Sequence, residues 1–168
     1  MRRTLGIVIP ALLAVVVSAA FFIPWRTVLV VSCDKTGETR FCASVTQGEE
    51  FVISYVHSVN RRPVYDTLRI EPEGMRIVKS RFDSFGAGIP EVATAEHPLR
   101  VGSDGWLEYT VDRPVSDVTI FVGRVAEHAL HIKDRVIALA AIAEPGTALN
   151  FSVEKQSLYK ILREGCIW

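Results

Sequence analysis

Residues 51–70 (FVISYVHSVNRRPVYDTLRI) limit the possible fold more than any other stretch, because two alternating runs flank a short polar segment. A period of two in β-branched and aromatic residues is typical of half-buried strands. Pro63 has no amide proton to donate to a strand ladder, so it marks the end of the loop or a sheet edge. We therefore predict a hairpin with a polar tip. This tip gathers His57, Ser58, Asn60, Arg61, Arg62, Tyr65 and Asp66.

The N-terminal segment is predicted to be a membrane helix, because residues 4–25 carry no charge. A helix of this length spans a hydrocarbon core of about 30 Å. Arg2 and Arg3 favour a cytoplasmic N-terminus, which places the following domain outside the cytoplasmic membrane. The alternative is a cleaved signal peptide and a secreted domain, since residues 17–20 offer small side chains at cleavage spacing. We prefer an uncleaved single-pass anchor, because the apolar run continues through residues 21–23.

The rest of the chain is predicted to be short strands separated by turns. Alternating or β-branched runs predict strands at 27–32, 40–45, 75–82, 105–111, 115–122, 128–132 and 147–153, in addition to the hairpin. Residues 112–114 are predicted to be a turn, 91–103 a loop, and 135–143 either a strand or a short helix. About nine strands with turns roughly every 8 to 12 residues are typical of an all-β antiparallel sandwich.

The expected organisation therefore has three parts. Residues 1–26 form the N-terminal membrane anchor or signal segment, residues 27–154 the β-sandwich domain, and residues 155–168 a C-terminal tail. About 130 residues are enough to bury a sizeable core in a single domain.

The cysteine pattern suggests one disulfide. Cys33 and Cys42 flank a predicted turn, so in an antiparallel hairpin they can lie opposite each other. An oxidising compartment outside the membrane would allow them to join, whereas the alternative is two free buried thiols. A structural zinc site needs four ligands, and no second pair of cysteines follows. Cys166 is left over, either as a free thiol or as a partner for a second molecule.

Several classes of function are disfavoured by the composition and by the residue pattern. The chain has 19 basic and 19 acidic residues and so lacks the net positive charge expected of a nucleic-acid binder. His57 and Ser58 are adjacent on a predicted strand and therefore point to opposite faces, which makes them a poor base and nucleophile. His128 and His131 alone supply too few ligands for a metal. We predict no enzyme activity, no metal and no cofactor, with a hydrolase as the weakest alternative.

Anion contacts are the most specific chemistry that the residues offer. Arg61, Arg62 and Arg124 carry guanidinium groups, which bind carboxylate or phosphate in a bidentate manner. Residues 84–90 (SFGAGIP) form a glycine-rich loop whose backbone N–H groups can face a ligand or a partner chain. Tyr65 and Asp66 either join this site or brace the turn.

Four segments together resemble the bacterial DUF1850 family: residues 55–59 (YVHSV), 63–66 (PVYD), 84–90 (SFGAGIP) and 122–123 (VG). The likeness extends over residues 27–153. The residues that match its motifs are His57, Ser58, Val59, Pro63, Gly86, Gly88 and Pro90. The resemblance implies a small extracytoplasmic β domain of uncharacterised activity, encoded beside TRAP-type transporters of the TAXI kind.

Two functional hypotheses follow. The first is an anchored accessory protein that contacts a TRAP-type permease or its solute receptor through the hairpin tip and the glycine-rich loop. The second is a ligand-binding domain that holds a small anion or carboxylate with Arg61 or Arg62 and orients it with His57. The candidate binding residues are His57, Ser58, Arg61, Arg62, Tyr65, Asp66, Gly86, Gly88, Pro90 and Arg124.

Overall fold

A computed structural model describes residues 2–86, 94 and 96–167, with side chains described from Ile9 onwards. The helices and strands, in chain order, are α1 (Arg2–Phe22), β1 (Arg26–Cys33), β2 (Thr39–Ser44), β3 (Glu50–Val56), β4 (Pro63–Glu71), β5 (Gly74–Phe82), β6 (Leu99–Val101), β7 (Leu107–Val115), β8 (Asp117–Phe121), β9 (Ala129–Ile132), β10 (Arg135–Ala138), η1 (Leu139–Ala141), β11 (Ala148–Gln156) and α2 (Leu158–Glu164).

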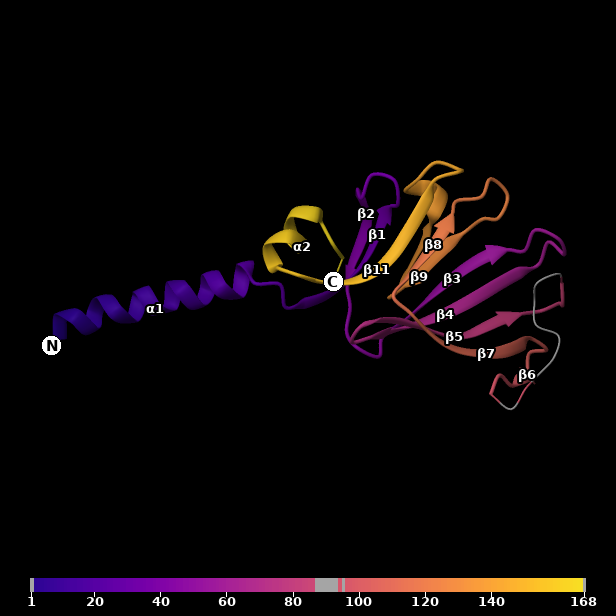
Figure 1. The fold of residues 1–168 in the computed structure, drawn as a ribbon, viewed down its shortest axis with the longest axis horizontal. Helices are drawn as coiled ribbons and strands as arrows, with labels where there is room; N and C mark the ends of the chain where they lie inside the picture. Colours follow the sequence, from indigo (N-terminus) through magenta and orange to yellow (C-terminus); the bar gives the residue numbers. More distant parts are fainter. Residues whose placement is uncertain (1, 87–93, 95, 168) are drawn as a thin grey trace.

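The described chain is mostly β and forms two antiparallel sheets (Figure 1). One sheet has the strand order β2-β1-β11-β8, and the other has the order β10-β9-β3-β4-β5-β7-β6. The larger of two hydrophobic clusters draws on both sheets, with Leu29 and Phe151 from the first and Phe51 and Leu68 from the second. Because one apolar cluster joins the two sheets, the arrangement is sandwich-like, as the sequence predicts.

The central hairpin forms as predicted. β3 pairs with β4 from Glu50↔Arg69 to Val56↔Pro63, so the alternating runs face each other along their whole length. Pro63 is the first residue of β4 and so marks the end of the loop, as predicted. On the other side of β3, strand β9 pairs only with residues 52–54, which leaves the end near Val56 free for other contacts.

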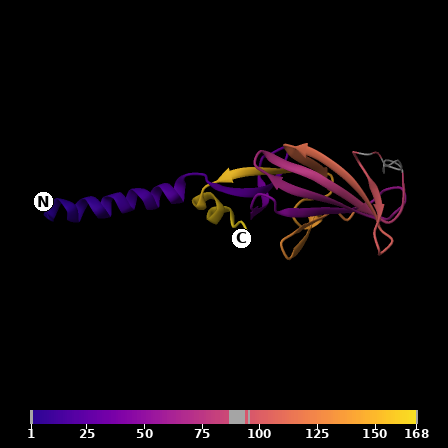
Figure 2. The same ribbon diagram turned by 90° about the horizontal axis from the view of Figure 1, so that it is seen from below.

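The N-terminal helix α1 projects from the β domain and ends beside α2 (Figures 1 and 2). The rings of Phe21 and Phe22 lie 6.0 and 5.5 Å from the ring of Tyr159 in α2. The side chains of α1 from Ile9 to Val17 are exposed. Within the part of the chain whose side chains are described, no helix is both long enough and apolar enough to cross a membrane.

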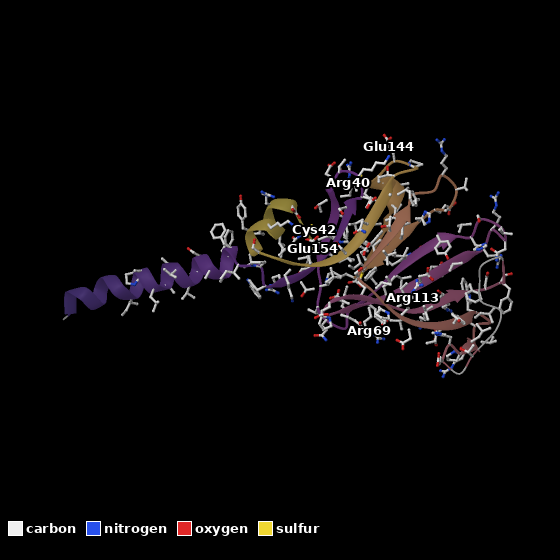
Figure 3. The ribbon with its side chains drawn as sticks, viewed as in Figure 1. Arg40, Cys42, Arg69, Arg113, Glu144 and Glu154 are labelled. Carbon is white, nitrogen blue, oxygen red and sulfur yellow. A yellow bond between two sulfur atoms is a disulfide. The ribbon has the colours of Figure 1, made fainter. Side chains whose placement is uncertain are left out.

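The predicted Cys33–Cys42 disulfide is wrong, because Cys42 is joined to Cys166 and Cys33 is a buried free thiol. Cys42 pairs with Val30 across β1 and β2, on the sheet face that packs under α2. Cys33 pairs with Leu149 of β11, in the row of side chains that faces the main core. The two cysteines therefore point to opposite faces of the sheet. Figure 3 shows Cys42 near α2.

The predicted turn at residues 112–114 is also wrong, because β7 continues through it to Val115. Asp112 has a positive φ of 48°, and the pairing with β5 shifts register between Ile77 and Lys79, so the extra residue is absorbed as an irregularity in the ladder. Pro114 is tolerated because β6 pairs only with residues 107–109, and no described strand pairs with Pro114 on that side.

The structure also defines three segments that the sequence left open or assigned to a loop or tail. Residues 135–143 contain both alternatives, a strand in β10 and a single 3₁₀ turn in η1. β6 occupies part of the predicted loop 91–103. The C-terminal tail forms α2, which begins where the Ser157 side chain accepts a hydrogen bond from Lys160 N–H at 3.2 Å and ends at Gly165 with φ 66°.

Candidate functional site

Three segments meet at the end of the domain away from α1 (Figures 1 and 2). They are the β3–β4 turn (57–62), the segment after β5 (83–86) and the β8–β9 connection (122–128), and we call them the distal loops. The side-chain amide of Asn60 donates to the carbonyl oxygens of Ser84 at 3.3 Å and Phe85 at 3.1 Å. Val56 N–H donates to the carbonyl of Ala126 at 2.7 Å. These bonds tie the three loops into one unit.

His57 supports the β3–β4 turn from within. Its backbone N–H donates to the Arg62 carbonyl at 2.9 Å, and its carbonyl accepts from Arg61 N–H at 3.0 Å. Its ring Nδ1 accepts from Val59 N–H at 3.3 Å. These contacts let Arg61 adopt a positive φ of 58°, so His57 shapes the turn as well as lying in it.

Arg62 links two of the distal loops. Its Nε donates to Asp83 Oδ1 at 3.0 Å, and its Nη2 forms an ion pair with the other carboxylate oxygen. This hydrogen-bonded guanidinium lowers the pKa of Asp83 below its usual range, and the carboxylate raises the pKa of Arg62. The charge of Arg62 is therefore already neutralised by Asp83.

Gly86 lies against the β3–β4 turn, so the glycine-rich loop and the hairpin tip are neighbours in space. A Cβ atom at this position would lie 2.8 Å from Asn60 Nδ2 and 3.4 Å from His57 Cε1. A residue with a Cβ would therefore displace the Asn60 amide from this position. Gly88 and Pro90 lie outside the described residues, so their predicted roles stay predictions.

The distal loops expose three large apolar side chains among polar and charged ones. Val59, Phe85 and Val125 are exposed, one on each of the three loops. Arg61 and Arg124 are also exposed on the same loops, as is Ser58. Exposed apolar side chains that gather into one patch with a polar rim mark protein-binding surfaces.

Tyr65 lies away from the distal loops, on the outer face of the seven-stranded sheet. It pairs with Ser54, and its ring lies 5.7 Å from Trp106 and 6.1 Å from His131. Ser54 Oγ and His131 Nε2 lie 2.7 Å apart and link β3 to β9. No acidic residue in the described part of the chain bonds to His131, so this serine–histidine pair lacks the group that orients a catalytic base.

Asp66 points to the opposite face, into the space between the two sheets. It pairs with Ile53 of the core and with Ser80, whose hydroxyl donates to its carboxylate. Burial raises the pKa of Asp66 above its usual range, and the Ser80 hydrogen bond partly opposes that shift. The alternation of strand faces separates Asp66 from Tyr65, and the sequence reading had grouped both with the tip.

A pocket of about 130 Å³ surrounds Asp66, and we call it the intersheet pocket. Its walls come from β3, β4 and β5 on one side and β8 on the other. The aliphatic lining consists of Ile53, Leu68, Ile77, Val118 and Ile120. The three polar side chains that line it are Tyr55, Asp66 and His128.

The other two polar groups of the pocket are electrically neutral near pH 7. Burial, followed by the nearby Asp66 charge, raises the pKa of Tyr55 to about 12. Burial lowers the pKa of His128, whose ring lies 5.9 Å from that of Tyr55. His128 Nδ1 accepts from Gly123 N–H at 3.3 Å, which leaves the proton of the neutral imidazole on Nε2.

Sequence reasoning missed Tyr55 and His128 as site residues. Tyr55 lies two positions after Ile53 and therefore shares the core-facing side of β3, a signal that the alternation contained. His128 comes from a distant connection, and only the sheet topology brings it to the pocket. Among the described residues, one group of side chains has the spacing of metal ligands, namely Cys42, Glu164 and Cys166, and its two sulfurs are joined in a disulfide.

The fold defines a two-sheet antiparallel β domain that follows an N-terminal helix. It carries hydrogen-bonded distal loops and a mainly aliphatic intersheet pocket that contains Asp66. The chain belongs to the family described as "Domain of unknown function (DUF1850)", whose model matches residues 51–139. The matched segment contains the distal loops and the whole lining of the intersheet pocket. No curated protein and no solved structure matches the chain.

Proposed function

We propose that this protein is a membrane-attached extracytoplasmic accessory domain that docks on a partner protein through its distal loops. The observation that carries the proposal is the exposure of Val59, Phe85 and Val125 on three loops that are bonded to one another. Loops that are already ordered lose little conformational entropy on binding. Arg61 and Arg124 add the guanidinium groups that are enriched at protein interfaces.

The membrane attachment rests on the N-terminal segment, in which residues 4–25 are uncharged. Arg2 and Arg3 orient the domain toward the outside of the cytoplasmic membrane. A cleaved signal peptide followed by secretion is the alternative. If the partner is the permease, attachment in the same membrane raises the effective concentration, so that a weak interface suffices.

The position of the distal loops favours a particular partner. They lie at the end of the domain away from α1, so an anchored domain would direct them away from the bilayer (Figure 2). A soluble extracytoplasmic protein reaches that end more readily than a membrane-embedded one. The TRAP-type association implied by the family resemblance therefore points to the solute receptor as the partner, with the permease as the second choice.

The ion pair between Arg62 and Asp83 weighs against the small-anion alternative. A guanidinium that is already held by a carboxylate contributes little to the capture of a second anion. Partner docking does not require Arg62 to be available, because the exposed apolar side chains provide the contact.

The test is co-purification of the tagged full chain from native membranes in mild detergent. Val125→Asp should reduce recovery of the receptor or permease at least tenfold. Val136→Asp is the matched control, because Val125 and Val136 are both 67% exposed and Val136 lies on β10. Equal recovery with both variants, or no transporter component in the wild-type preparation, would overturn the proposal.

A further inference from the structure

We propose that the intersheet pocket is a binding site for a small organic ammonium ion, held by the Asp66 carboxylate and the aliphatic walls around it. The site lies inside the domain, whereas docking uses the exposed surface of the distal loops, so the two proposals stand or fall separately.

The first argument is the environment of Asp66. Its carboxylate is on the core side of β4 and accepts a hydrogen bond from the Ser80 hydroxyl. Within the described part of the chain, no lysine, arginine or histidine forms an ion pair with it. A buried carboxylate without a counter-charge is costly, so the group either takes up a proton or pairs with a cation. A bound ammonium ion would supply that cation.

The second argument is the shape and lining of the pocket. A volume of about 130 Å³ is comparable to the roughly 150 Å³ apolar cavity that holds benzene in another protein. The pocket therefore suits a ligand with about four to six carbon atoms. Its aliphatic walls can enclose the hydrocarbon part while the charged group meets Asp66.

The third argument is the character of the other two polar groups. Tyr55 offers an aromatic ring and a hydroxyl, and an aromatic face attracts a cation. The neutral imidazole of His128, with Nδ1 held by Gly123, does not repel a positive ligand. An anionic ligand would instead face the Asp66 carboxylate with no compensating charge. The pocket should therefore select cations over anions of the same size.

The experiment measures binding to the full chain in a nonionic detergent by isothermal titration calorimetry. The probes are n-butylammonium and cyclopentylammonium chloride, with 1-butanol, butyrate and sodium chloride as comparison solutes. We expect saturable binding of at least one ammonium ion, at least tenfold tighter than that of 1-butanol, and none of butyrate. Equal binding of 1-butanol would overturn the proposal, because it would show a purely apolar cavity.

Two variants locate the site. Asp66→Asn should weaken ammonium binding at least tenfold, whereas Asp134→Asn, the same change at an exposed turn residue, should leave it unchanged. Ile120→Phe, which fills the pocket and keeps Asp66, should also abolish binding and tests the location independently of the carboxylate. Unchanged binding in Ile120→Phe, or no ammonium binding to the wild-type chain, would overturn the proposal.

Discussion

Cys42 and Cys166 lie 124 positions apart in the sequence and are joined by a disulfide that fastens the segment after α2 to β2. Backbone bonds reinforce the connection, since Ser44 N–H donates to the Ile167 carbonyl at 2.8 Å and Ile167 N–H donates to the Cys42 carbonyl at 3.0 Å. The C-terminal segment is therefore part of the folded domain, and it covers the outer side of the four-stranded sheet.

Removing this disulfide should lower the free energy of unfolding. A cross-link that closes a loop of this length restricts the unfolded chain by about 3–5 kcal/mol. Cys166→Ser should shift the urea midpoint down by the corresponding amount, and reduction of the wild-type protein should give the same shift. Cys33→Ser is the control, because Cys33 is not cross-linked. Thiol titration of the denatured, unreduced chain should find Cys33 alone, and a reactive Cys42 would contradict the assignment.

Gly86→Ala should loosen the distal loops. The added Cβ would lie 2.8 Å from Asn60 Nδ2, which donates to the Ser84 and Phe85 carbonyls, so the amide must give up those bonds or the loop must move. We expect a loss of about 0.5–1.5 kcal/mol in stability, the typical net contribution of a hydrogen bond whose groups remain accessible to water. Hydrogen exchange at residues 57–62 should report the change.

A double-mutant cycle identifies the cause. If Gly86→Ala acts by displacing Asn60, the double variant with Asn60→Ala should be no less stable than Asn60→Ala alone. Additive losses would show that Gly86 acts through a different contact.

The strands near the hairpin could be predicted from the sequence because alternation is a local property. Residues 51–70 contain both faces of β3 and β4, and the register follows from that pattern. The disulfide could not be predicted in this way. The pairing depends on the sheet face to which Cys42 of β2 points, which is the face of its neighbour Val30, and on the packing of α2 against that face. Both follow from the order of strands in the sheet.

The candidate site shows the same division. The polar tip and the glycine-rich loop were recognised from composition, and the structure places Gly86 against His57. Tyr65 and Asp66 were assigned to that tip because they are near it in the sequence. They lie on β4, and consecutive strand residues point to opposite faces, so neither side chain joins the tip. The pocket also needs His128, which only the connection between the sheets brings close. Long-range topology, rather than residue chemistry, was the missing information.

Asp66→Asn should stabilise the domain at neutral pH. Burial raises the pKa of Asp66, so the folded chain holds this proton more tightly than the unfolded chain does. Stability from this group is fully present below the ordinary carboxyl pKa and is lost as the pH rises through the raised value. The free energy of unfolding of the variant should therefore exceed that of the wild type by on the order of 1 kcal/mol at pH 7 and should equal it at low pH.

The measurement is urea unfolding of both proteins across this pH range. Asp83→Asn should behave in the opposite way, because the Arg62 hydrogen bond lowers the pKa of Asp83 and its contribution is lost as the pH falls. If Asp66→Asn is less stable than wild type at every pH, favourable contacts of the carboxylate outweigh the cost of burying its charge, and the prediction is wrong.

His128 should titrate below the usual range of histidine. Burial lowers its pKa, so below about pH 6.5 the unfolded chain takes up a proton that the folded chain does not. The contribution of His128 to stability is therefore present above that pH and is lost as the pH falls. NMR titration of the ring should give a midpoint below that of an unfolded peptide, and His128→Gln should flatten the acid side of the stability profile. A midpoint above the peptide value would mean that the imidazolium is paired with Asp66.

Gln156→Met should raise the stability of the domain. Gln156 ends β11 and is buried, with 1% of its surface exposed. Its Nε2 donates to Glu154 at 3.3 Å, whereas its Oε1 has no hydrogen-bond partner in the described part of the chain. Met has a similar volume and no acceptor to desolvate, so we expect a gain of about 1 kcal/mol in the free energy of unfolding. Gln47→Met, at an exposed turn, is the matched control and should be neutral. A loss of stability in Gln156→Met but not in Gln47→Met would show that a buried water molecule satisfies Oε1, because removing the amide would then break a bond that the folded domain uses.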